Sequence, residues 1–220
     1  MLRKLTRYFI PGAIFIVFLF APRPPGIRQG YFPLFLLFGF SLWQRDKIRN
    51  FIKPSQSLLA KYLLIALLWS LWVEKVLGRQ QEARYPFLIF LISLTFTIPY
   101  FLIWHKLIAK FKNFTFAEVF IFSGLSGAIA QTLLTPKVLG VFSDVSFIPA
   151  LLMAIYNFLF ILVMFGMLTS LPFALLFEDK FGESNLSNTK KKLLSLGSVF
   201  FALPFLIISI IILRVLFPTP

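Results

Sequence analysis

The chain has 220 residues, of which 59% are hydrophobic and only 14% are charged, and its mean hydropathy is +0.87. Soluble globular domains average about 45–50% apolar and about 25% charged residues, so this composition excludes a soluble enzyme, a disordered tail and a coiled coil. The chain has 22 Lys and Arg against 8 Asp and Glu, an excess that would suit an acidic partner if the basic residues formed one face. The lack of cysteine excludes disulfides and thiolate metal sites.

Seven apolar segments follow one another along the chain, and Lys61 and Glu118 are the only charged residues inside them. A helix rises about 1.5 Å per residue, so about 20 residues cross a hydrocarbon core of about 30 Å. We therefore predict an all-α fold, a polytopic transmembrane helical bundle that forms one integral membrane domain over 1–220 without a soluble domain. The predicted segments are 8–21, 31–43, 57–73, 85–104, 115–134, 147–171 and 193–213.

Two places in this series need a local interpretation. Segments 8–21 and 31–43 are short and are joined by a proline-rich link, so we expect an N-terminal hairpin of two thin spans or one re-entrant loop. The other five segments are expected to be full spans. Pro172 follows the sixth segment, and we expect it to end that helix and to leave 173–177 as a short interfacial turn.

The distribution of basic residues predicts the orientation of the spans. The side that carries the N-terminus has 15 Lys and Arg, whereas the other side has 7. The positive-inside rule then places the N-terminus in the cytoplasm and the C-terminus outside. The expected location is the plasma (inner) membrane. Because these residues are divided among short loops, no nucleic-acid partner is predicted.

The segment 115–134 contains a run of small residues. Ser123, Gly124, Gly127 and Ala128 form overlapping small-xxx-small pairs. Small residues let helix backbones approach closely in lipid, where helices do not attract one another hydrophobically. We predict that these four residues form a helix-packing surface and that this segment is central in the bundle.

The same run also matches a catalytic motif. Gly124-Leu125-Ser126-Gly127 resembles the GxSG motif of the rhomboid intramembrane proteases, a resemblance that implies a nucleophilic role for Ser126. A serine nucleophile needs a base within hydrogen-bond reach. The family takes this histidine from its last helix, but 193–213 contains none, and the single histidine of the chain is His105. Catalysis by Ser126 is therefore kept as an alternative to packing.

Glu118 is the one acidic residue within a segment, and intramembrane acids are candidates for proton relays. It also follows Thr115 by three residues, which is the spacing of a helix-capping box, and we favour this structural role. Gln131 and Asn157 are neutral polar residues that could bond between helices or line a polar path. No cofactor or metal site is predicted.

Lys190, Lys191 and Lys192 directly precede the last segment, where they can anchor the topology and contact anionic lipid headgroups. The predicted partners are therefore membrane lipids, together with a possible membrane-protein partner. With no catalytic site beyond Ser126, the leading hypothesis is a non-enzymatic transporter-like, lipid-handling or complex-subunit protein. The alternatives are an intramembrane serine hydrolase and a structural membrane scaffold.

Overall fold

The computed structural model describes residues 31–51, 57–77, 86–111, 114–134, 147–177 and 189–216, so the predicted segment 8–21 lies outside the described residues. Within them every regular element is a helix and there is no strand, which confirms the all-α prediction. The helices are α2 (Tyr31–Trp43), α3 (Arg45–Phe51), α4 (Leu58–Leu77), α5 (Pro86–Phe111), α6 (Phe116–Leu134), α8 (Phe147–Leu176), α9 (Thr189–Leu196) and α10 (Ser198–Leu216).

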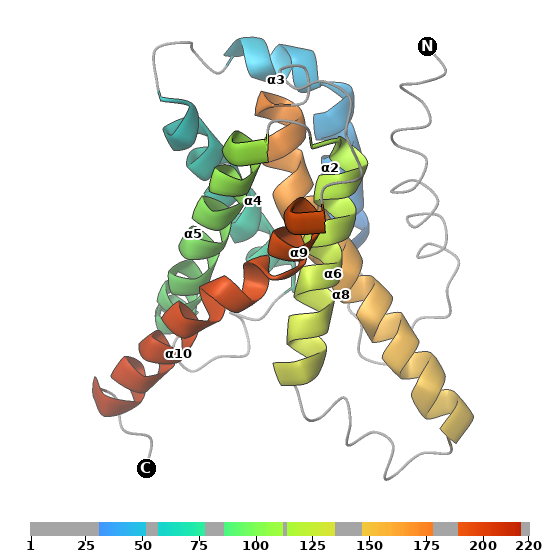
Figure 1. The fold of residues 1–220 in the computed structure, drawn as a ribbon, viewed down its shortest axis with the longest axis vertical. Coiled ribbons are helices and arrows are strands. Elements are labelled where there is room, and N and C mark those ends of the chain that lie inside the picture. The colour runs from blue at the N-terminus through green and yellow to red at the C-terminus, as the bar shows by residue number, and fades with distance from the viewer. Residues whose placement is uncertain are drawn as a thin grey trace.

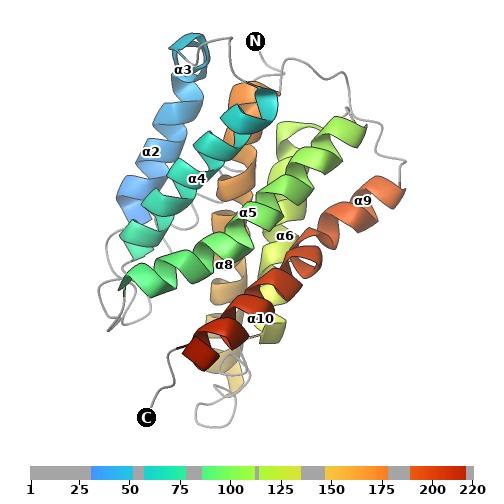
Figure 2. The same ribbon diagram turned by 90° about the vertical axis from the view of Figure 1, so that its left-hand side faces the viewer.

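The helices form a bundle around the pair α6 and α8, which share the most extensive contact (Figure 1). Helix α10 packs mainly on α5, whereas α4 contacts both α5 and α8. Short helix α3, the starts of α4 and α9 and the end of α5 lie at one end of the bundle (Figure 2). This arrangement gathers the charged helix ends at that end and leaves the apolar helix centres in the middle.

Helix α8 passes through Pro172 and ends only at Leu176, so the prediction that this proline ends the helix is wrong. Every residue from 171 to 177 is buried, and packing on neighbouring helices holds this last turn in place. The Arg49 guanidinium of α3 also donates to the carbonyls of Leu175 (2.8 Å) and Ala174 (3.0 Å), groups that have no partner within the helix. These bonds satisfy the last carbonyls of α8, which would lack a partner within the helix with or without the proline.

The last apolar segment is divided in two. We expected it to begin at residue 193, but helix already begins at Thr189, and a turn at Gly197 separates α9 from α10. The amide of Gly197 still donates to the carbonyl of Leu193 at 2.9 Å, so the chain bends without losing every helical hydrogen bond. The break changes the direction of the chain between the polar helix α9 and the apolar helix α10.

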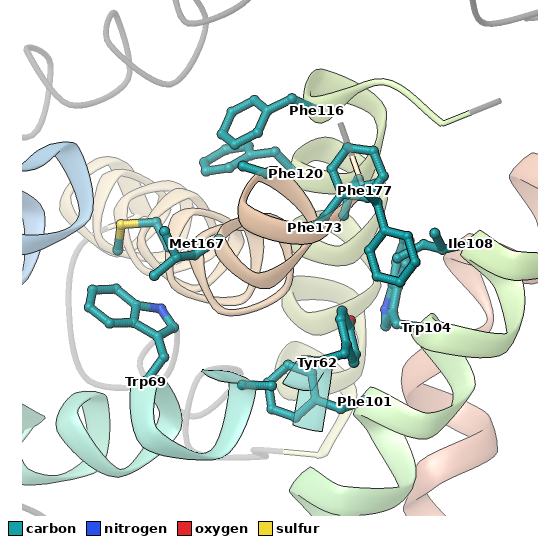
Figure 3. Packing of buried hydrophobic residues seen from close by; sticks show 14 of the residues in the cluster. Tyr62, Trp69, Phe101, Trp104, Ile108, Phe116, Phe120, Met167, Phe173 and Phe177 are labelled. Carbon is teal, nitrogen blue, oxygen red and sulfur yellow. The ribbon is translucent and has the colours of Figure 1, made fainter. Parts of the chain in front are cut away.

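The core of the bundle is rich in aromatic side chains (Figure 3). The rings of Phe116 and Phe120 are stacked with centroids 6.3 Å apart, and those of Phe173 and Phe177 are stacked at the same distance. Within the described residues, one helical stretch, Ala154–Leu176, is long and apolar enough to cross a membrane, and most of it is buried in the fold. The apolar stretches Leu58–Leu71 and Phe116–Ile129 are shorter.

Candidate functional site

Small residues bring α6 and α8 into backbone contact. A Cβ atom added to Gly124 would lie 2.4 Å from the carbonyl oxygen of Leu162, and one added to Gly127 would lie 2.1 Å from the ring of Phe165. Ser123 is fully buried, and its hydroxyl donates to the carbonyl of Val119 in its own helix at 2.7 Å.

Ser123 also reaches α8, because its hydroxyl is 3.3 Å from the carbonyl of Phe165. Ala128 is fully buried. Sequence reasoning missed Gly166, which approaches from the opposite side: its added Cβ would lie 2.9 Å from the carbonyl oxygen of Phe120. The close approach therefore depends on small residues in both helices.

Ser126 is engaged at the start of α10. Its buried hydroxyl oxygen accepts a hydrogen bond from the backbone amide of Val199 at 3.1 Å and lies 3.2 Å from the hydroxyl of Ser198. The first amides of a helix have no partner within that helix, and a serine oxygen is a common substitute. Ser126 thus caps α10 from a different helix. His105 lies elsewhere, with its ring 5.8 Å from that of Phe177.

Several hydroxyl groups meet where α5, α6, α8 and α10 come together. The hydroxyl of Thr169 donates to that of Tyr100 at 3.3 Å, and the polar neighbours of Tyr100 also include Ser123 and Ser198. All these side chains are buried. We call this group, with Ser126, the hydroxyl cluster: Tyr100, Ser123, Ser126, Thr169 and Ser198.

A buried ion pair lies at the charged end of the bundle. The ammonium of Lys191 on α9 is 2.8 Å from Oε1 of Glu118 on α6, and the two side chains are 0% and 7% exposed. The ammonium also lies 4.7 Å from the ring centroid of Phe114, which places it in a cation–π contact. The side chain of Lys191 is therefore held by two partners from the start of α6.

The other carboxylate oxygen of Glu118 serves the capping box. Oε2 accepts from the backbone amide of Thr115 at 2.8 Å, and the amide of Glu118 donates to the hydroxyl of Thr115 at 3.2 Å. Each oxygen of the carboxylate thus has a different partner, one that starts helix α6 and one that attaches α9. The spacing of Thr115 and Glu118 indicates the first role, whereas the second needs a residue 73 positions further along the chain.

The three consecutive lysines have different environments. Lys190 is exposed and Lys192 is half-buried, whereas Lys191 is fully buried. The expectation that Lys191 faces lipid headgroups is wrong, because its ammonium is enclosed by Glu118 and Phe114. The position of Glu118 inside an apolar segment was the one sequence signal for this pairing, because a buried acid needs a nearby cation.

Gln131 and Asn157 were also predicted to have a polar role, but their side chains lie outside the described residues. The structure thus brings the small residues of α6 together with α8, Ser126 together with α10, and Glu118 together with α9. Comparisons with protein-family models, with curated proteins and with solved structures find no match.

Proposed function

We propose that the chain is a polytopic membrane protein whose helices cross the bilayer with the N-terminus in the cytoplasm and the C-terminus outside. The supporting observation is a surface of large apolar side chains over α2, α4, α8 and α10, together with buried polar groups inside. Monomeric soluble proteins rarely expose extended apolar patches. The exposed apolar residues include Leu36, Phe40, Leu64, Leu68, Ile148, Leu152, Ile155, Phe201, Phe205, Ile207, Ile208 and Ile211.

Basic side chains at the charged end support this orientation. Lys47, Lys106, Lys110 and Lys190 are exposed there, on α3, α5 and α9 (Figure 2). Basic residues near an anionic leaflet contribute about 1 kcal/mol each to binding. Anionic headgroups at this end are the proposed lipid partner, with Lys190 and Lys192 as their ligands.

Within the membrane we propose a non-enzymatic, transporter-like role. The observation that carries it is the hydroxyl cluster, in which side chains from four helices meet in the interior, with the Glu118–Lys191 ion pair towards the charged end. Polar groups inside an apolar bundle are costly, and in membrane proteins they mark paths for ions and polar solutes. The hydrolase alternative loses support because the hydroxyl oxygen of Ser126 already accepts a hydrogen bond from the backbone amide of Val199.

Membrane insertion is tested first. The protein should remain in the pellet after carbonate extraction, and single cysteines should report topology because the natural chain has none. We expect the thiols introduced by Lys106→Cys and Asn185→Cys to react with a membrane-impermeant thiol reagent only from the cytoplasmic side. The thiol introduced by Lys137→Cys should react only from outside. Release into the supernatant would overturn the membrane assignment, and reversed labelling would overturn the orientation.

The role is tested by deletion of the gene, followed by untargeted profiling of lipids and metabolites inside and outside the cell. A transporter-like protein should change the distribution of a compound across the membrane, and Ser126→Ala, expressed at the normal level, should restore that distribution only in part because it removes a member of the hydroxyl cluster. A fluorophosphonate label on the wild-type protein that Ser126→Ala removes would favour the hydrolase instead.

A further inference from the structure

Two buried donors near the charged end of the bundle have no hydrogen-bond partner among the described residues. They are the hydroxyl of Tyr62 on α4 and the indole nitrogen of Trp104 on α5, and both side chains are 0% exposed. More than nine in ten buried polar groups in proteins have a partner, which can be protein or ordered water. Two such groups in one region therefore call for an explanation.

Both donors adjoin the same polar side chain. The hydroxyls of Tyr62 and Tyr100 interact electrostatically, and the indole N–H of Trp104 faces the Tyr100 hydroxyl without the geometry of a direct hydrogen bond. Figure 3 shows the side chains of Tyr62 and Trp104 directed into the same region below Phe177. The ring of His105, whose Nε2 is likewise buried without a hydrogen-bond partner, lies 5.5 Å from that of Tyr62, and the apolar ring of Phe101 lies 6.2 Å from it.

The chemistry of these groups selects the occupant. An indole N–H can only donate, whereas a tyrosine hydroxyl can both donate and accept. A water molecule can accept from Trp104, exchange a hydrogen bond with Tyr62 and donate towards Tyr100. A buried water needs two to four such partners.

We propose that Tyr62, Tyr100 and Trp104 bind a buried water molecule. This water extends the hydroxyl cluster from α5 to α4, so that polar groups continue from Ser126 to Tyr62. The inference depends on the unpartnered donors and not on the transporter-like role, so either can fail without the other.

Radiolytic hydroxyl footprinting of the purified full-length protein in ¹⁸O-labelled water tests the proposal, because bound water generates radicals inside the core. Phe120, which is 1% exposed, is the buried standard, and Phe51, which is 87% exposed, is the solvent-accessible standard. We expect Tyr62 and Trp104 to acquire ¹⁸O at a rate close to that of Phe51. Labelling as slow as that of Phe120 would overturn the proposal without the need for any variant.

Tyr62→Phe provides the second measurement. A hydroxyl that holds water stabilises the protein, so its removal should raise the unfolding equilibrium constant about fivefold, the value of one hydrogen bond, and should slow the labelling of Trp104. An unpartnered hydroxyl in a dry core would give the opposite result, since its removal would leave stability unchanged or increase it. Unchanged labelling of Trp104 in this variant would likewise contradict a water shared by the two residues.

Discussion

The ion pair between α6 and α9 makes a strong prediction about stability. At an N–O distance of 2.8 Å the attraction between Lys191 and Glu118 is about 6 kcal/mol for an effective dielectric constant of about 20. Removing the solvation of each buried ion costs several kcal/mol, so the net value of the pair is small. Removal of one partner is different, because it leaves a buried charge without compensation and costs about 3–5 kcal/mol.

Glu118→Gln and Lys191→Met are the appropriate single variants. Glutamine can keep the capping box with Thr115, so the first change removes the charge and preserves the start of α6. Each single variant should lose about 3–5 kcal/mol, whereas the double variant should lie within about 1–2 kcal/mol of the wild type because no unpaired charge remains. The exposed neighbour Lys190 provides the control, and Lys190→Met should change stability by less than about 0.5 kcal/mol.

Reversible unfolding in mixed micelles, followed by circular dichroism, measures this double-mutant cycle. The expected coupling energy is about 3 kcal/mol or more, well above the few tenths of a kcal/mol that independent sites show. If the two single effects add, so that the double variant is the least stable of the set, the ion pair does not exist in the folded protein. Equal losses in Lys190→Met would show instead that the assay reports general charge effects.

Three further predictions concern the helix contacts. Gly124→Ala should cost about 1–3 kcal/mol of unfolding free energy because the new Cβ meets a backbone oxygen, whereas Gly39→Ala, with nothing within 4 Å, should be neutral or stabilising by up to about 1 kcal/mol in the same assay. Ser126→Ala should cost about 1–3 kcal/mol because it leaves an α10 amide unpaired, and fluorophosphonate labelling of the wild type above the level of this variant would contradict the capping role. Arg49→Met should cost about 1.5–3 kcal/mol and increase amide hydrogen exchange in the last turn of α8, while Lys47→Met, at an exposed position of the same helix, should leave that exchange unchanged.

The apolar runs predicted much of the secondary structure, because the length of an uncharged run limits where a helix can begin and end. Helix α2 has the bounds expected for 31–43, and α6 begins one residue after the expected start at 115. Helix α8 continues past Pro172 because neighbouring helices bury residues 171–177, and Arg49 from a distant part of the chain binds the carbonyls of the last turn. Local pattern contains no information about such a partner.

The candidate site was predicted unevenly for a similar reason. The spacing of Thr115 and Glu118 indicates a capping box, since both partners lie within one turn. The partner of Glu118 lies in a run of three lysines that look equivalent in the sequence, and only the direction of α9 selects Lys191. Ser126 shows the same limit: its motif was visible, but its contact with α10 depends on the bend at Gly197.

The order of synthesis gives the ion pair a further consequence. Glu118 is made 73 residues before Lys191, an interval of about 4–15 s at a translation rate of about 5–20 residues per second. Throughout that time the carboxylate lacks the ammonium of Lys191 and must stay hydrated or take up a proton. Helix α6 can therefore reach its final charge state and packing only when α9 has been made, so a chain that stops before residue 191 retains an uncompensated acid in its core.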